Sequence, residues 1–119
     1  MHIDWNNVPA EQLNPLVTRK CVHQPGMTLA RFHLKKGAVV PLHHHINAQI
    51  SNILTGSLSF NMEGKRLVIK AGESLTIDPN VPHEAIADED CEALDIFIPE
   101  RADWIANDDA YLRAGAARK

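Results

Sequence analysis

The sequence of 119 residues is poor in cysteine and has no cluster of basic residues, the features that mark disulfide-rich or zinc-binding proteins and proteins that bind nucleic acid. It contains only two cysteines, Cys21 and Cys91, without the paired spacing of a zinc ribbon or a redox site, so we expect free thiols rather than a disulfide. It has no run of basic residues, and its net charge is −3. This charge pattern argues against nucleic acid or anionic lipid as a partner.

Long apolar segments are also missing. Between residues 36 and 63 there is no Asp, Glu, Lys or Arg, but His, Asn, Gln, Ser and Pro interrupt the stretch too often for a membrane span. The N-terminus has neither the basic start nor the apolar run of a signal peptide. We therefore expect no membrane partner, and a cytoplasmic location is the default prediction.

Short alternating runs predict an all-β fold. Residues 30–34 place Ala, Phe and Leu alternately with Arg and His, which is the period-two pattern of a half-buried strand. Further short runs occupy residues 49–54, 58–62, 66–69, 75–77, 84–87 and 93–98. Gly, Pro, Asn and acidic residues separate them, as expected for turns. Strands at this spacing, without a long helical pattern, indicate a small antiparallel sandwich or barrel.

The length of the chain supports one domain covering residues 1–119, with a single core and distinct ends. Residues 1–25 contain three prolines and are predicted to form an irregular arm that ends in an edge strand. Residues 102–119 are predicted to form a tail. Within this tail we expect short packed turns at 103–105 and 110–112, followed by a frayed end from residue 115 onward.

Three histidines are spaced so that they can converge on one metal ion. His43 and His45 are two residues apart in a segment without helical periodicity, so an extended strand would point both side chains to one face. His83 follows a Pro/Asn turn and would arrive from another strand. Three converging imidazoles would repel one another once protonated, whereas neutral imidazole suits a divalent transition metal. We interpret these residues as ligands of one ion of Ni, Zn, Fe, Mn or Co.

Gln49 is the fourth candidate ligand. Its carbonyl oxygen can coordinate a metal or accept a hydrogen bond from a metal-bound water, and it carries no charge. A neutral ligand set leaves the double positive charge of the ion uncompensated, which favours an anionic ligand and Lewis-acid chemistry. The two-His-one-carboxylate site of non-haem iron oxygenases differs in this respect. The remaining histidines are interpreted as ordinary surface or core residues: His2, His23, His33 and His44.

A second group of candidates lies in and after residues 94–98. Three aliphatic side chains share one face of this run, which leaves Asp95 and Phe97 on the other, so we expect Asp95 inside the barrel beside Phe97. A buried carboxylate needs a partner, and two interpretations stay open: catalysis, or a structural salt bridge to Arg101. Phe97 alone is interpreted as a core residue. Arg101, at the strand exit, is either a solvated loop residue or a bidentate ligand of a substrate carboxylate.

Two glycine-bounded segments carry a resemblance to a known family. Residues 37–56 and 72–83 resemble the paired motifs of the cupin superfamily, G-x5-H-x-H-x3-4-E-x6-G and G-x5-P-x-G-x2-H-x3-N, with the second motif matched as far as His83. The resemblance implies a jelly-roll barrel of two antiparallel sheets. Because small cupins are often dimers and strand edges lie near the N-terminal arm, a homodimer is also expected. The chain departs from the motifs at four positions: Gln49, Asp78, Asn80 and Ala87.

Within that superfamily, the chain is similar to the small single-domain cupins of the pectin-degradation type, the KdgF-like proteins. The resemblance runs from about residue 5 to residue 113, and the segments 36–43, 79–83 and 95–101 carry it. The metal-binding residues of that family are three His and one Gln, which match the four candidate ligands above.

This resemblance also assigns roles to the second group. The functional Asp, Phe and Arg of the family fall on Asp95, Phe97 and Arg101. It implies that the protein linearises 4,5-unsaturated uronates, small anionic sugars released by polyuronide lyases, to 5-keto-4-deoxyuronate. Arg101 would then pair with the substrate carboxylate, Asp95 would transfer the proton, and Phe97 would form an apolar wall. Two alternatives are a metal-dependent dioxygenase and a non-catalytic sugar- or effector-binding module.

Overall fold

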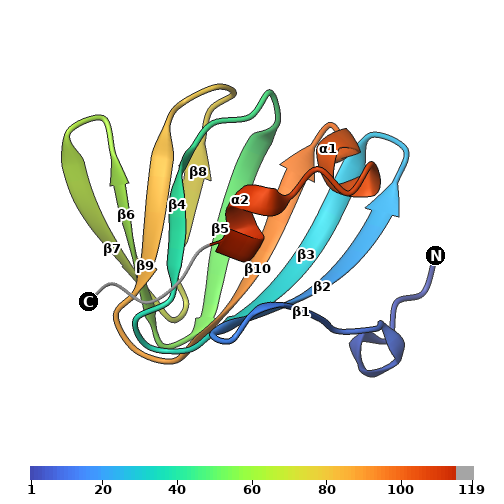
Figure 1. Cartoon of the computed structure of the whole chain (residues 1–119), viewed down its shortest axis with the longest axis horizontal. Coiled ribbons are helices and arrows are strands. Elements are labelled where there is room, and N and C mark those ends of the chain that lie inside the picture. Colours follow the sequence, from blue (N-terminus) through green and yellow to red (C-terminus); the bar gives the residue numbers. More distant parts are fainter. Residues whose placement is uncertain (115–119) are drawn as a thin grey trace.

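Two antiparallel sheets face each other in the computed structural model, which describes residues 1–114 (Figure 1). The larger sheet contains, in spatial order, β1 (Glu11–Asn14), β2 (Val17–Gln24), β3 (Met27–Leu34), β10 (Cys91–Ile98), β5 (Ala48–Thr55) and β8 (Ser74–Ile77). The smaller sheet contains β4 (Val39–His43), β9 (His83–Ala87), β6 (Ser57–Met62) and β7 (Lys65–Lys70). The predicted all-β jelly-roll architecture of two antiparallel sheets is therefore confirmed.

The strand that carries Asp95 lies in the middle of the larger sheet. β10 pairs with β3 on one side and β5 on the other, so that Asp95 is opposite Ala30 and Ser51. Along β10, buried residues alternate with more exposed ones, and both Asp95 and Phe97 are buried. The alternation confirms the prediction that these two side chains point into the barrel while the three aliphatic neighbours point outward.

The N-terminal region is more regular than predicted. Strands β1 and β2 form an antiparallel hairpin from Glu11 onward, where an irregular arm was predicted, so the irregular part of that prediction is wrong there. The predicted edge strand is present, because β1 lies at the edge of the larger sheet. Pro15 and Pro25 lie in the turns after β1 and β2, where a fixed φ favours a turn and no strand hydrogen bond is lost. Before Glu11, the described chain contains a short 3-10 helix at Trp5–Asn7.

The C-terminal region folds back over the barrel as two short helices, α1 (Ala102–Ile105) and α2 (Ala110–Ala114) (Figure 1). They replace the packed turns predicted for this region, and each contributes one buried side chain, Trp104 and Leu112. The side-chain amide of Asn14 donates a 3.1 Å hydrogen bond to the carbonyl oxygen of Leu112 and so fixes α2 to β1. The fraying predicted for residues 115–119 lies outside the described residues.

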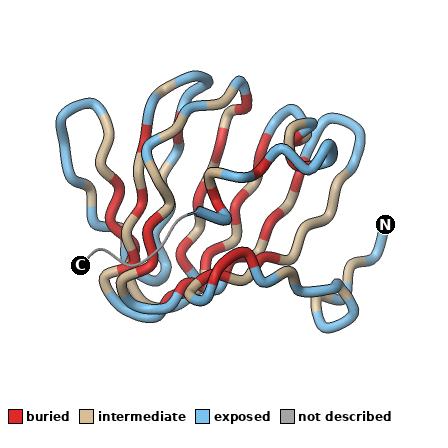
Figure 2. The backbone as a smooth tube through the Cα atoms, in the orientation of Figure 1, coloured by how far each residue is buried: buried red, intermediate tan, exposed pale blue. Residues whose placement is uncertain are grey.

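Buried residues alternate with more exposed ones along strands of both sheets (Figure 2). They include the side chains predicted from the alternation in β3, and the core extends to Trp104 and Leu112 from the C-terminal helices. Both cysteines are free, as predicted; burial raises the pKa of Cys21 and of Cys91 to about 12, so both thiols are protonated at neutral pH. No helix within the described residues is long and apolar enough to cross a membrane.

Candidate metal centre

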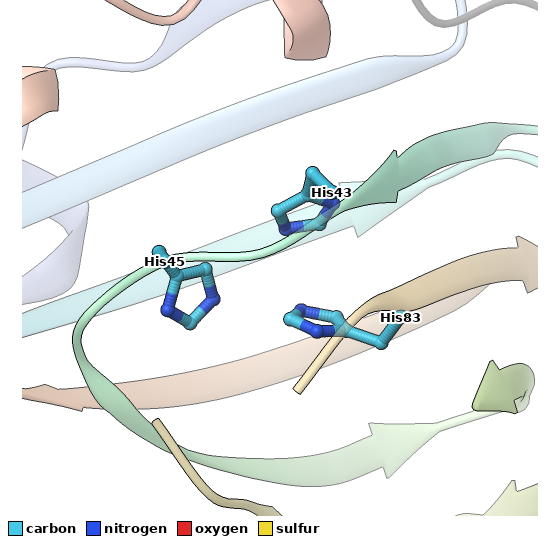
Figure 3. Close-up of side chains that lie close together, drawn as sticks. All are labelled: His43, His45 and His83. Carbon is cyan, nitrogen blue, oxygen red and sulfur yellow. The ribbon is translucent and has the colours of Figure 1, made fainter. Parts of the chain in front are cut away.

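The three predicted histidines converge at one end of the smaller sheet (Figure 3). His43 ends β4 and His83 begins β9, and the two are opposite each other in the strand register. One ligand atom from each of His43, His45 and His83 lies within 4.8 Å of the others. The prediction that an extended strand carries both His43 and His45 is not met, because His45 lies in the loop after β4. His44 is exposed between them, in agreement with its interpretation as a non-ligand.

Backbone carbonyl groups fix the orientation of all three imidazoles. Nδ1 of His43, His45 and His83 lies 2.7, 3.0 and 2.8 Å, respectively, from a carbonyl oxygen two residues away in the chain. A carbonyl oxygen can only accept a hydrogen bond, so Nδ1 carries the proton in His43 and His83. The Asn47 carbonyl favours the same tautomer in His45, whose Nε2 lies equally close to Oε1 of Gln49. Each Nε2 therefore keeps a lone pair for the centre of the cluster, which is the tautomer that a metal ligand needs.

Gln49, on β5, presents its carbonyl oxygen to the same centre. Its Oε1 lies 3.0 Å from Nε2 of His45, while its Nε2 donates to Oγ of Ser51 at 2.9 Å and to Oδ2 of Asp95 at 3.4 Å. These two contacts hold the amide with its oxygen toward the histidines. Two acceptors, the imidazole lone pair and the amide oxygen, consequently face each other, and a cation between them would satisfy both.

Electrostatics keep the cluster neutral and ready to bind a cation. Burial, together with smaller contributions from neighbouring imidazoles and Arg101, lowers the pKa of His43 to about 3 and that of His45 to about 4. The pKa of His83 is also lowered, mainly by burial, and its Nε2 has no hydrogen-bond partner among residues 1–114. Neutral imidazoles with inward lone pairs, one of them unsatisfied and buried, fit a divalent transition metal.

Asp95 lies next to this centre and is buried, with 8% of its surface exposed. Burial raises its pKa to about 7, against the opposing effects of the Ser51 hydrogen bond and the positive charge of Arg101. Its Oδ1 is buried and has no hydrogen-bond partner in the described chain. The ion pair to Arg101 that we considered is absent from the described residues, because Arg101 pairs with Asp103 instead.

Arg101 is buried, with 1% of its surface exposed, which contradicts its interpretation as a solvated loop residue. Its Nε and Nη2 donate to the two carboxylate oxygens of Asp103 at 3.0 and 2.8 Å. Nη2 also donates to the hydroxyl oxygen of Tyr111 at 2.8 Å. The guanidinium carbon lies 4.0 Å from the ring centroid of Trp104 and 4.8 Å from that of Phe97, so two aromatic rings hold it in place.

A small cavity of about 40 Å³ joins the candidate metal centre to the second group of candidates. His43, Gln49 and His83 form one part of its lining. The lining also includes Asp95, Phe97, Arg101, Trp104, Tyr111 and Leu112. The candidate residues predicted from the sequence thus line one cavity, with the exception of His45. The ring of His45 packs edge-on against that of Phe97, with centroids 5.7 Å apart.

Sequence reasoning missed three residues of this site, Asp103, Trp104 and Tyr111. Asp103 and Tyr111 bond directly to Arg101, and the indole Nε1 of Trp104 donates to the hydroxyl oxygen of Tyr111 at 3.2 Å. The only available signal was the presence of aromatic residues within two short predicted turns. That pattern predicts that these aromatic side chains are packed, but it does not identify the residues that they contact.

A jelly-roll barrel with a histidine cluster in its interior defines a cupin, and the chain belongs to the cupin domain family, whose model matches residues 30–97. Among individual proteins, it is similar to the pectin degradation protein KdgF of Dickeya dadantii (strain 3937). The two are 29% identical over 103 residues, which cover 84% of this chain and 94% of that protein.

Solved structures show the same fold. KdgF from Halomonas sp. superimposes with a TM-score of 0.82 at 24% identity, over 87% of this chain and 97% of that chain. An RmlC-like cupin from Shewanella frigidimarina NCIMB 400 gives a TM-score of 0.80 at 24% identity, over 86% of this chain and 93% of the other. A variant of oxalate decarboxylase from B. subtilis gives 0.72 at 19% identity, over 82% of this chain but only 29% of that longer one.

Proposed function

We propose that this cupin is a metal-dependent enzyme that opens the ring of 4,5-unsaturated uronates and yields the linear 5-keto-4-deoxyuronate. The observation that carries the proposal is the charge of the cavity lining. Four neutral candidate ligands stand beside a buried arginine, so a bound divalent ion would meet no protein carboxylate in its own ligand set. Such a cavity suits a small molecule that brings its own negative charge.

The similarity to KdgF supports the same substrate class. That relative is named a pectin degradation protein, and its match covers most of both chains. Pectin is a polyuronide, and lyases that cleave it leave a C4=C5 double bond in the terminal sugar. The monosaccharide released from that end is a cyclic hemiacetal with a carboxylate at C6, which is the class of ligand that the cavity charge favours.

The proposed reaction is an isomerisation, so its atoms and charge balance without a co-reactant. The C1 hydroxyl gives up its proton to a general base as the C1–O5 bond breaks, and the bonding electrons go to O5, which produces an aldehyde at C1 and an enolate at C5. The same base then returns a proton to C4, and C5 becomes a ketone. The reaction needs a group that accepts a proton from one position and delivers a proton to another.

Asp95 is the residue that we assign to proton transfer. It is the carboxyl group in the cavity lining, and its raised pKa of about 7 allows both protonation states near neutral pH. The unpartnered Oδ1 would face the substrate, while Oδ2 keeps its contact with Gln49. Arg101 would bind the substrate carboxylate, and Phe97 would form an apolar wall.

His43, His45, His83 and Gln49 would hold the metal ion. When bound, the ion would supply Lewis-acid polarisation of the substrate oxygens. The backbone hydrogen bonds at each Nδ1 would keep the imidazoles oriented during the reaction, and burial would exclude bulk water from them.

Unsaturated galacturonate provides the direct test. Loss of its conjugated ultraviolet band would be followed with the metal-loaded protein, with the metal-stripped protein and without protein. We expect the band to disappear faster only with the loaded protein. A rate equal to the spontaneous one would refute the proposal, and oxygen uptake with an organic substrate in the iron-loaded protein would favour the oxygenase alternative.

The metal identity, the homodimer and the cytoplasmic location stay predictions. Elemental analysis of protein purified without a histidine tag would identify the ion among Ni, Zn, Fe, Mn and Co. Light scattering during gel filtration would measure the mass of the particle, and a mass of one chain would contradict the dimer.

A further inference from the structure

The guanidinium of Arg101 has no free two-nitrogen edge for a substrate carboxylate. An arginine can bind a carboxylate with two parallel hydrogen bonds along its Nε–Nη2 edge or along its Nη1–Nη2 edge. Asp103 occupies the first edge with both of its oxygens. The hydroxyl oxygen of Tyr111 accepts the remaining hydrogen of Nη2 at 2.8 Å, which places it on the second edge. Only Nη1 lacks a partner within the described chain.

The hydroxyl group of Tyr111 has a hydrogen still to donate. Its oxygen accepts one hydrogen bond from Arg101 Nη2 at 2.8 Å and another from Trp104 Nε1 at 3.2 Å. Both lone-pair positions of the phenolic oxygen are thereby used, and its O–H hydrogen remains. Among the described residues no acceptor for this hydrogen is found, although a half-buried hydroxyl ordinarily has one.

The ring of Tyr111 lies beside the candidate metal centre. The ring centroid lies 4.6 Å from that of His43, with the two planes 33° apart, and Tyr111 lines the same cavity as His43 and Asp95. The side chain comes from α2, which passes across the barrel between the two sheets (Figure 1). Tyr111 therefore contacts a candidate metal ligand through its ring and the substrate arginine through its oxygen.

We propose that Tyr111 is a substrate-binding residue whose hydroxyl donates to the substrate carboxylate, and that Nη1 of Arg101 supplies the second donor. Because Asp103 already accepts from Nε and Nη2 of Arg101, the substrate carboxylate would be bound by Nη1 of Arg101, which is charged, and by the Tyr111 hydroxyl, which is neutral. This inference rests on the proposed function, because the ligand is the carboxylate of a uronate. It adds a specificity determinant: a sugar with a neutral group at C6 gives the phenol no anionic acceptor.

The first test uses the fact that Tyr111 is the only tyrosine of the chain. Metal-loaded protein containing ¹³C-labelled tyrosine gives a single set of tyrosine ring signals. These signals would be recorded during titration with galacturonate, a saturated uronate without the C4=C5 bond, and with galactose as the neutral control. We expect the signals to shift with galacturonate only. Saturable binding of galacturonate without a shift would overturn the inference.

The second test removes the hydroxyl and keeps the ring. Calorimetry would compare galacturonate binding to metal-loaded wild type, Tyr111→Phe and Ser74→Ala. Ser74 is an exposed residue whose hydroxyl donates to Asn52 outside the cavity, so its variant controls for loss of a hydroxyl group. We expect Tyr111→Phe to weaken binding roughly 10- to 100-fold, the range for a lost hydrogen bond to a charged group. Ser74→Ala should bind as wild type does.

The outcomes separate this inference from the proposed function. Equal binding by Tyr111→Phe and wild type, with active wild type, would refute the role of Tyr111 and leave the function intact. If wild type neither converts unsaturated uronates nor binds galacturonate, the proposed function fails and this inference fails with it. Metal content, measured for each variant, should be unchanged because Tyr111 supplies no candidate ligand atom.

Discussion

At the scale of single residues, Gln49 decides the charge of the metal centre. We predict that Gln49→Glu binds the metal more tightly but lowers kcat/KM for unsaturated uronate by about tenfold or more. The added carboxylate would offset part of the ion's charge, and it would stand where an amide now donates to Asp95 at 3.4 Å. Chelator competition would report the affinity, and loss of ultraviolet absorbance the rate.

Gln24→Glu makes the same chemical change at an exposed position at the end of β2 and serves as the matched control. Its metal affinity and kinetics should equal those of wild type. Unchanged kcat/KM in Gln49→Glu would show that the neutrality of this ligand is not used in catalysis.

A substitution of Asp95 distinguishes an enzyme from a non-catalytic binding module. We predict that Asp95→Asn loses turnover by roughly 10²- to 10⁴-fold, the usual contribution of a proton-transfer group. Its metal content and galacturonate affinity should stay close to those of wild type, because Asp95 is not a candidate ligand and the amide is similar in shape. Turnover and calorimetry on the same samples would measure both properties.

Glu92→Gln is the control for this change, since Glu92 lies on the same strand but forms an ion pair with Arg31 away from the cavity. Wild-type turnover in Asp95→Asn, together with intact ligand binding, would exclude Asp95 from the chemistry.

At the scale of elements, Asn47 connects the loop that carries His45 to the segment that leads into Arg101. Its buried Nδ2 donates to the carbonyl oxygens of Pro99 and Glu100 at 2.6 and 3.1 Å. We predict that Asn47→Ala lowers the free energy of unfolding by about 1–3 kcal/mol, because two carbonyl groups lose their buried donor. The KM for uronate should also rise, since Arg101 follows this segment directly.

Denaturant unfolding and steady-state kinetics would test both effects of the Asn47 substitution. Asn6→Ala, at an exposed position in the N-terminal 3-10 helix, should change neither quantity. A normal KM in a destabilised Asn47→Ala would mean that the position of Arg101 does not depend on this contact.

The strands were predictable where apolar and polar residues alternate, and the N-terminal hairpin was not. In β3 and β10 the alternation is clear because one face packs against the core. In β1 and β2 the prolines weighed against strands, yet Pro15 and Pro25 lie in the turns between strands. A proline indicates a position where a strand cannot continue. From the sequence alone, a proline that ends a strand cannot be distinguished from one within an irregular segment.

The convergence of the histidines was predictable from the sequence, whereas the part of the cavity lining that comes from the C-terminal helices was not. His43 and His45 are close in sequence, and the turn before His83 is local, so spacing indicated convergence. Tyr111 reaches Arg101 only because two short helices fold back across the barrel. Nothing in the spacing of the last residues predicts that path, which depends on packing against distant strands.

At the scale of the whole molecule, a buried ion pair fastens the C-terminal region to the larger sheet. Nη2 of Arg19, on β2, lies 2.9 Å from Oδ2 of Asp109, and both side chains are almost fully buried. We predict that Asp109→Asn lowers the free energy of unfolding by about 1–3 kcal/mol, because Arg19 and Arg113 would lose a charged partner while Arg19 keeps its ion pair with Glu11. Denaturant unfolding at neutral pH would measure the loss, and an unchanged stability would contradict this role.

The same ion pair predicts how the free energy of unfolding falls at acid pH. Burial tends to raise the pKa of Asp109, but hydrogen bonds from Arg113 and Arg19 together lower it below its ordinary value. A carboxyl group with a lower pKa in the folded state contributes stability above its unfolded pKa of about 3.9, and this contribution is lost as the pH falls through the folded pKa. Asp109→Asn should therefore flatten the loss of stability below about pH 4, measured by unfolding at a series of pH values.

The central place of β10 has a consequence for how the chain folds. Among residues 1–114, β10 is the last strand to be synthesised, yet it lies between β3 and β5, which precede it by many residues in the sequence. Until it inserts, both neighbours present unpaired edges, and closing such distant contacts is slow and exposes the chain to aggregation. Since Asp95 and Phe97 arrive on this strand, an incomplete nascent chain cannot form the barrel first and add the carboxyl group proposed for proton transfer afterwards.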